Sequence, residues 1–514
     1  MIVFFMTLSM CSLEIGDEFN YDGLVLVLID KDMNCEITGY KGVNESIDIM
    51  ESCLINGTQY RVMTIGDFAF YNCSSLVSVR IPESVVIIGN GVFGQCSSLK
   101  NIYLPSTISA LGHSIFEDCS SLVSLVIPSS VESIGNRAFF GCTSLMTVEI
   151  PSNVTYIGKL AFVYCSSLSS LVLPSGLKRI SPGMFIDCKS LKSILIPENV
   201  YSIGERAFLC CSSLESIIFQ SDVVSIGMFA FCECTSLLSI NLPPSVKFIG
   251  LNEDCELTIN DFFIGSSGYW RGSIPKMGSV FFECSSLSTI TIPFGVSVID
   301  FYSFGFCTSL VTIHLPINLT KIRCRAFYGC SSLSSIEIPQ NITSIESETF
   351  YDCSSLTSIS IPSGVTTIGC RAFFNCSSLE SIDIPVSVKS IEDGAFKGCN
   401  SIKSIIIPSK VEILGDYVFE SCTKLESLII LSDSIVFESH SENSNTFDDC
   451  NQLQRILFYG SRNPAQNIKI PSKTSIYVKK TYEDEFFGDK KVTRIDFNNL
   501  PWNDGDLCEN QHHL

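Results

Sequence analysis

The stretch "CSSLVSLVIPSSVESIGNRAFFG", residues 119–141, holds one complete unit of the pattern that decides the fold of this chain. Leu122, Leu125 and Ile127 lead into an apolar–polar alternation, which is typical of a short strand with one buried face. Pro128 follows at once and cannot donate a ladder hydrogen bond, so it ends that strand. The rest of the unit offers a second short extended segment and a tight corner. Its 23 residues leave no room for a long helix beside two strands.

The same unit recurs along most of the chain. A cysteine begins each copy, and successive copies are 23 residues apart except at two places, where the interval is 50 and 28. The cysteines of this series are Cys73, Cys96, Cys119, Cys142, Cys165, Cys188, Cys211, Cys234, Cys284, Cys307, Cys330, Cys353, Cys376, Cys399, Cys422 and Cys450. A fixed period of this length indicates a repeat array that grows along one axis, so the 514 residues need not divide into globular domains.

A phenylalanine stands three residues before every cysteine of the series, from Phe70 to Phe447. No other position of the repeat is as uniform. Burial of one such ring is worth roughly 1.5–3 kcal/mol. We therefore expect the rings of successive coils to stack in a continuous buried column.

These features predict a leucine-rich solenoid, a right-handed and curved rod of about sixteen coils. Each coil is expected to contain two short parallel strands joined by 3-10 or short helical turns. The position of Gly135 varies between copies, and a strict positive-φ site would not accept arginine or glutamate freely. We therefore expect a roomy, solvent-facing corner there. Other copies place at this position Ser181, Asp300, Arg323, Glu346 and Glu392.

Twenty-five cysteines raise the question of disulfides. Equivalent cysteines on neighbouring coils would lie about 4.8 Å apart, which is close enough for a bridge, so the spacing leaves both states open. Identical side chains that all point inward favour free thiols, because an unpaired cysteine behaves as a small buried hydrophobe.

The consensus L-x-S-I-x-I-P-x-x-V-x-x-I-G-x-x-A-F-x-x-C-S-S resembles the 23-residue, Treponema-type leucine-rich repeat of BspA-like surface antigens, over about residues 20–490. The resemblance implies an adhesin-like protein at the cell surface or secreted. It also implies protein partners, with host or extracellular matrix proteins among the candidates.

We expect an N-terminal cap at 13–63, a solenoid at 64–458 and a C-terminal cap and tail at 459–514. Residues 1–12 are short and apolar. They are either a weak secretory signal, although no lysine or arginine precedes the apolar core, or a disordered N-terminus. The 50-residue interval places an insertion at about 251–277.

Composition argues against several classes of function. A net charge of −20 repels the phosphates of nucleic acids, so we expect no nucleic-acid partner. No apolar run reaches the ~18 residues that cross a bilayer, so we expect no membrane span. The sequence contains none of the common catalytic or phosphate-binding motifs, and its five histidines are scattered. We therefore expect no enzyme activity and no catalytic, cofactor or metal site.

The third and fifth residues of L-x-S-I-x-I should point away from the core. The third is nearly always serine or threonine, which predicts a structural row of hydroxyls. The fifth residue varies between copies, so we expect this position to determine the chemical character of the surface. Exposed apolar residues gather there and either mark a contact site or reflect the preference of strands for such residues. The candidate contact residues of this row are Tyr103, Val126, Val172, Leu195 and Ile218.

The insertion supplies a second candidate contact. Tyr269, Trp270 and Arg271 are residue types that anchor protein interfaces. The alternative is a tolerated loop that packs back on the solenoid.

Our leading hypothesis for the whole chain is a non-enzymatic, protein-binding and adhesive module at the cell surface or secreted. The alternative is an intracellular scaffold in the cytoplasm with no adhesive role.

Overall fold

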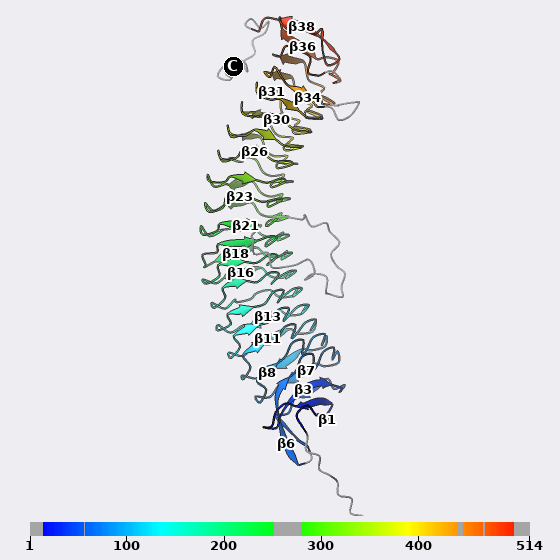
Figure 1. Cartoon of the computed structure of the whole chain (residues 1–514), viewed down its shortest axis with the longest axis vertical. Coiled ribbons are helices and arrows are strands. Elements are labelled where there is room, and N and C mark those ends of the chain that lie inside the picture. Colours follow the sequence, from blue (N-terminus) through cyan, green and yellow to red (C-terminus); the bar gives the residue numbers. More distant parts are fainter. Residues whose placement is uncertain (1–13, 56, 251–278, 439–445, 466–467, 498–514) are drawn as a thin grey trace, which may run out of the picture. The chain divides into compact units, whose positions relative to one another are not determined.

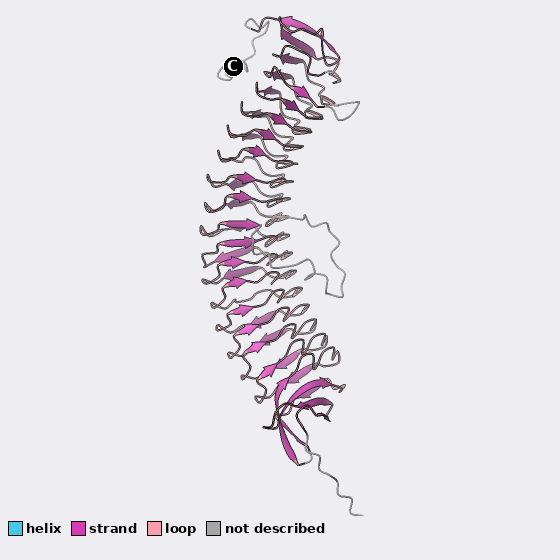
Figure 2. Ribbon diagram, viewed as in Figure 1, coloured by secondary structure: helices cyan, strands magenta, loops and turns pink. Residues whose placement is uncertain are grey.

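The computed structural model of the chain describes residues 14–55, 57–250, 279–438, 446–465 and 468–497. It forms two compact units, unit 1 (Met1–Asp222) and unit 2 (Val223–Leu514). In each unit, short strands stack coil upon coil (Figures 1 and 2). The predicted signal at 1–12, the insertion and its residues Tyr269, Trp270 and Arg271 lie outside the described residues.

Unit 1 has two rows of strands. The first row follows the series cysteine and contains β7 (Ser78–Arg80), β9 (Asn101–Tyr103), β11 (Ser124–Val126), β13 (Thr147–Glu149), β16 (Ser193–Ile196) and β18 (Ser216–Phe219). The second row follows the proline and contains β8 (Ile87–Ile88), β10 (Ala110–Leu111), β12 (Ser133–Ile134), β14 (Tyr156–Ile157), β15 (Arg179–Ile180) and β17 (Ser202–Ile203).

The N-terminal part of unit 1 continues both rows. Its strands are β1 (Glu18–Tyr21), β2 (Leu24–Leu28), β3 (Asn34–Tyr40), β4 (Ser46–Asp48), β5 (Ser52–Ile55) and β6 (Thr58–Ile65). The sheet order is β1-β2-β3-β6-β5, and β6 also pairs in parallel with β8. Strand β4 pairs in parallel with β7. This sheet covers the apolar end that the first coil would otherwise expose.

Unit 2 repeats the same arrangement. Its first row contains β20 (Ser239–Ile240), β22 (Thr289–Thr291), β24 (Thr312–His314), β27 (Ser358–Ser360), β29 (Ser381–Asp383), β31 (Ser404–Ile407), β33 (Ser427–Ile430) and β35 (Arg455–Phe458). Its second row contains β19 (Ser225–Gly227), β21 (Phe248–Gly250), β23 (Val298–Ile299), β25 (Lys321–Ile322), β26 (Ser344–Ile345), β28 (Thr367–Ile368), β30 (Ser390–Ile391), β32 (Ile413–Leu414) and β34 (Val436–Phe437). At its C-terminal end, β36 (Ser475–Lys479), β37 (Phe486–Phe487) and β38 (Lys490–Ile495) extend the first row in the order β35-β36-β38-β37.

Neighbouring coils pair in parallel with a constant offset of one repeat, as Leu125 with Val148 and Ile359 with Ile382 show. The prediction of two short parallel strands in each coil is confirmed for most coils. The Val172 coil has no first-row strand, and in that row the coil of Glu337 has only an isolated parallel bridge to Ser360. The prediction of 3-10 or helical turns is wrong for the described part of the chain, where the corners are hydrogen-bonded turns and bends. No helix able to cross a bilayer occurs among the described residues.

The phenylalanine column is present in both units. In unit 1, ring centroids from Phe70 to Phe208 are 5.1–5.9 Å apart with planes within 24° of parallel. In unit 2, the rings from Phe231 to Phe447 are 5.4–6.1 Å apart and within 17° of parallel. Offset stacking at such distances is favourable, so the predicted core is confirmed.

Each series cysteine has a specific hydrogen bond. The Sγ of Cys142 donates to the carbonyl oxygen of Phe116, 3.1 Å away in the preceding coil. Equivalent bonds of 2.9–3.3 Å recur along both units. The described cysteines are free thiols, and those of the column from Cys96 onward are buried. The same carbonyl oxygen also accepts the backbone N–H of the cysteine in its own coil, as Phe116 does from Cys119 at 3.1 Å, so the column thiol adds a second hydrogen bond that links adjacent coils.

The corner before each cysteine has left-handed backbone at two positions. Five residues and one residue before the cysteine, φ is positive, as at Arg325 (62°) and Gly329 (70°), or Glu348 (56°) and Asp352 (56°). Glycine occupies these positions only in some coils, although left-handed backbone costs other residues roughly 1–2 kcal/mol each. The burial of the intervening phenylalanine holds the corner in this shape.

Truncation of a column ring should destabilise the protein far more than truncation of an exposed ring. Phe350 is fully buried between Phe327 and Phe373. We expect Phe350→Ala to cost about 3–5 kcal/mol, measured by urea unfolding followed by circular dichroism. The matched control is Phe294→Ala in the same unit, because that ring is 68% exposed. Equal losses from both variants would contradict the column as the core.

The thiol column should make the protein sensitive to alkali. Burial raises the pKa of the Cys353 thiol far above its ordinary value, and that of Cys376 likewise. Above about pH 8.5 the unfolded chain loses thiol protons that the folded chain keeps, so stability falls as pH rises, by about 1.4 kcal/mol per pH unit for each thiol.

The measurement is the free energy of unfolding in urea between pH 7 and pH 10. We expect a flat profile up to about pH 8 and a steep fall above it. In the variant Cys353→Ala, the free energy of unfolding should fall by about 1.4 kcal/mol less per pH unit, because one thiol fewer ionises on unfolding. A slope unaffected by this substitution would mean that the column thiols ionise in the folded state.

Candidate functional site

The outward face of the first-row strands in unit 1 is built by in-register pairing. Inward residues such as Ile194 and Ile217 are buried, so their neighbours in the strand point outward. The register places Leu195 beside Ile218 and Val126 beside Glu149 on adjacent coils. Residues that are 23 apart in sequence thus become lateral neighbours on one surface.

The predicted residues of this row are exposed. The exposed fraction is 62% for Tyr103, 65% for Val126, 82% for Val172, 40% for Leu195 and 55% for Ile218. Apolar side chains left in water on neighbouring coils are costly unless something covers them. The structure therefore brings five of the eight candidate residues onto one face.

Two further apolar residues belong to this face and were not predicted. Val123 is 44% exposed and Met146 is 54% exposed. They stand directly after the buried leucines Leu122 and Leu145, one position before the strand begins. The sequence signal was an apolar residue at a position that is polar in most other copies, with Val77, Leu238 and Val311 as the further apolar residues there. We call the seven residues the apolar face, namely Tyr103, Val123, Val126, Met146, Val172, Leu195 and Ile218.

Few charges accompany the apolar face. At the outward positions of these coils and of the coil before them, the exposed cations are Arg80, Lys100 and Lys192, and the exposed anions are Glu149 and Glu215. Arg80 lies 3.9 Å from Asp48 at the N-terminal margin, where both side chains are solvated. The face is therefore close to neutral on a chain whose net charge is −20.

The equivalent row of unit 2 has a different character. From Asn241 to Asp383 its fifth-position residues are polar. The predicted hydroxyl row appears there as a 3.2 Å contact between Thr289 and Thr312. Other hydroxyls bond to carbonyl oxygens instead, as Ser331 does to Thr308 at 3.4 Å. At the fifth position unit 2 is thus polar from Asn241 to Asp383 where unit 1 is largely apolar, while Leu238 and Val311, directly before their strands, are 57% and 45% exposed.

The corner at the Gly135 position is tight, so the prediction of a roomy corner is wrong. A Cβ added at Gly135 would lie 2.6 Å from the backbone of the preceding coil, and one at Gly158 would lie 2.4 Å away. Where a side chain does occur it is enclosed, since Ser181 and Asp300 are only 2% and 4% exposed. The position therefore faces the neighbouring coil. As expected, φ at Gly135 is not positive.

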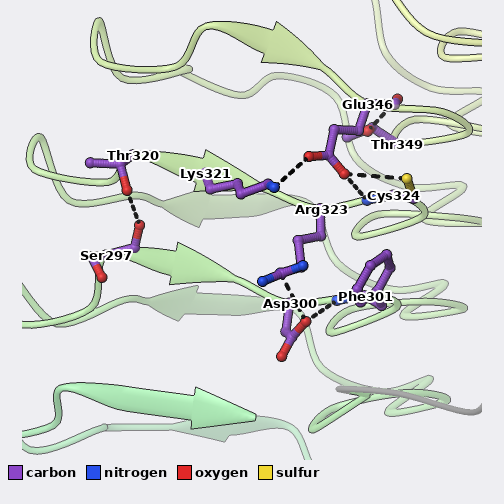
Figure 3. A network of polar contacts seen from close by, with 9 residues as sticks. All are labelled: Ser297, Asp300, Phe301, Thr320, Lys321, Arg323, Cys324, Glu346 and Thr349. Carbon is purple, nitrogen blue, oxygen red and sulfur yellow. Dashed lines mark hydrogen bonds and ion pairs between the residues drawn. The ribbon is translucent and has the colours of Figure 1, made fainter. Parts of the chain in front are cut away.

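Charged residues at this corner are held by bonds between coils (Figure 3). Asp300 Oδ1 lies 3.3 Å from Arg323 Nε. On the next coil, Glu346 Oε2 accepts hydrogen bonds from the backbone N–H of Cys324 at 2.9 Å and from its Sγ at 3.2 Å. Glu346 Oε1 is 3.3 Å from Lys321 Nζ. Acidic and basic side chains on successive coils thus form ion pairs and hydrogen bonds at the position where other copies have glycine.

These contacts also determine thiol chemistry at the corner. Cys370 repeats the Cys324 arrangement, with Glu392 Oε2 3.2 Å from its Sγ. Burial and the adjacent carboxylate raise the pKa of the Cys370 thiol to about 11 and raise the pKa of Cys324 as well. A thiol that stays protonated at neutral pH is a poor nucleophile and a poor metal ligand. Among the described residues, no group of three or more metal-ligating side chains comes together.

The fold and its exposed sheet face define a leucine-rich repeat protein. The model of the family described as BspA type leucine rich repeat region, six copies, matches residues 63–188, 157–267, 276–385 and 366–463. The chain belongs to this BspA-type leucine-rich repeat family. Membership supports a repeat protein that acts by protein–protein contact on a non-enzymatic kind of scaffold.

A solved structure with a TM-score above 0.5 shares this fold. A leucine-rich repeat protein from Bacteroides ovatus is 24% identical with a TM-score of 0.54, and the match covers 90% of this chain and 100% of that one. A leucine rich cell surface protein from Faecalibacterium prausnitzii is 28% identical with a TM-score of 0.47, covering 80% and 94%. A leucine-rich repeat protein from Treponema pallidum is 30% identical with a TM-score of 0.33, covering 43% and 91%. No curated protein matches the chain.

Proposed function

We propose that this protein recognises another protein through the apolar face, as a non-enzymatic adhesive module displayed at the cell surface or secreted. The observation that carries the proposal is the exposure of Val172, Leu195 and Ile218 on successive coils, at a position of the repeat that is polar from Asn241 to Asp383 in unit 2. A contiguous exposed apolar area on a soluble protein usually marks a contact.

The scaffold suits such a role because it separates stability from recognition. The free energy of folding resides in the phenylalanine column and the inward strand residues. Fifth-position side chains contribute little to it, so they can match a partner without changing the fold. The family supports protein contact in general, and the BspA-like resemblance supports display outside the cell.

The insertion is proposed as a second contact. Tyr269, Trp270 and Arg271 are of the types that anchor interfaces, and loops carried by a rigid scaffold often hold the binding residues.

The protein is further proposed to have no catalytic activity. The enclosed and protonated thiols of the corner support this, because they leave no activated nucleophile there.

A charge placed on the apolar face should abolish binding without unfolding the protein. Leu195→Asp would put a carboxylate into the contact, where its desolvation should weaken binding at least about thirtyfold, or about 2 kcal/mol. The matched control is Ser360→Asp, which is the equivalent outward position in unit 2. Binding is measured with proteins retained by the immobilised wild-type chain, and folding by circular dichroism and melting temperature.

We expect the partner to bind the wild type and Ser360→Asp equally and to be lost from Leu195→Asp. Equal retention by all three chains would refute the apolar face as the contact. Display is tested separately by protease treatment of intact cells of the source organism. Protection of the protein in intact cells but not in lysed cells would favour the intracellular scaffold.

A further inference from the structure

The outward residues of the apolar face can be compared with those of a second, identical face whose coils run in the opposite order. Each coil presents one outward residue just before its first-row strand and one at the fifth position. From the Tyr103 coil to the Ile218 coil, these pairs are Lys100 and Tyr103, Val123 and Val126, Met146 and Glu149, Ser169 and Val172, Lys192 and Leu195, and Glu215 and Ile218.

Reversal about the midpoint of these six coils brings unlike charges together. Lys100 then lies opposite Glu215, and both side chains are exposed. Tyr103 lies opposite Ile218, and Val126 lies opposite Leu195, so large apolar side chains meet at matching positions. Every exposed residue of these pairs can reach a facing surface.

A two-fold axis parallel to the strands produces this reversal. Such an axis places two copies face to face with their strands aligned, which is one of the favoured ways for sheets to pack. The interface is isologous, so each favourable pair occurs twice. The repeat spacing of both surfaces is the same because both surfaces are the same sequence, so the match does not drift along the face.

Charge favours a second copy over a basic partner. The chain carries a net charge of −20, and two copies repel each other over most of their surface. The apolar face and its first coil carry three cations, Arg80, Lys100 and Lys192, against two anions, Glu149 and Glu215. It is therefore an area where two acidic copies can approach without repulsion.

The size of the face sets the strength of the contact. Six coils at about 4.8 Å span roughly 29 Å, and three outward residue columns span roughly 13 Å. The area of roughly 400 Å² per copy, or roughly 800 Å² in total, is below that of a standard specific interface, so the contact should be weak and dependent on concentration. Glu149, which lies opposite Val172 in this register, limits the affinity further.

We infer that the apolar face binds a second copy of this chain, with coil order reversed and Lys100 of each copy paired with Glu215 of the other. This inference rests on the proposed function, since it names the partner of the same face. Within one chain Lys100 and Glu215 are five coils apart, about 24 Å. Any coupling between them must therefore be intermolecular.

The experiment is sedimentation equilibrium of the full chain from about 1 to about 300 μM, a range that covers weak dimers. The variants are Lys100→Glu, Glu215→Lys and the double variant. Each single variant sets like charges opposite each other twice and should raise the dissociation constant at least about tenfold. The double variant restores the pairs and should return to within about threefold of the wild type.

The outcomes separate the two proposals. A concentration-dependent dimer weakened by each single variant and rescued by the double variant supports the inference. A chain that stays monomeric throughout, or a dimer indifferent to these charges, overturns it. If Leu195→Asp nevertheless abolishes binding of a different protein, the proposed function stands and only self-association fails. A dimer lost in Leu195→Asp but not rescued in the double variant refutes the reversed register.

Discussion

The hydrogen bond from a cysteine thiol to the carbonyl oxygen of the preceding coil's phenylalanine is the contact on which the rest of the structure depends. The same phenylalanine stacks its ring on the next ring of the column, so one residue supplies both the apolar contact and the acceptor. The carbonyl oxygen of Phe116 also accepts a hydrogen bond from the backbone N–H of Cys119 at 3.1 Å, so the thiol of Cys142 adds a second bond that ties one coil to the next. Serine at this position would bury a more polar group, and alanine would remove the bond between the coils. This double demand explains why phenylalanine and cysteine are fixed at their two positions while most others vary.

A core of this kind leaves the outward positions free. Fifth-position residues on adjacent coils become lateral neighbours through the parallel register, so a change at one of them alters the surface and not the fold. At the fifth position unit 1 carries mostly apolar residues, and unit 2 carries polar ones from Asn241 to Asp383. The contrast between the units is therefore a difference in surface chemistry on the same scaffold.

Much of the fold could be predicted from the sequence, because the determining residues recur with one period. The strand alternation, the terminating proline and the inward phenylalanine determined the coil, and the exposure of Val126 followed from its parity in β11. The corners could not be predicted. Left-handed backbone occurs at Arg325 and Glu348 without glycine, and substitution at the Gly135 position suggested open space where the neighbouring coil lies. Met146 was missed because it precedes the alternating segment, and Trp270 lies outside the described residues.

The tie between successive coils also governs how such a gene can change in length. Cys284 bonds to the carbonyl oxygen of Phe231 although 53 residues separate them, so the contact between successive coils is kept across the longer interval. Duplication or deletion of one whole 23-residue unit by unequal recombination would likewise preserve every thiol bond and ring contact on either side. Alleles of different length could therefore arise in single steps, each with an intact core and a new arrangement of surface residues.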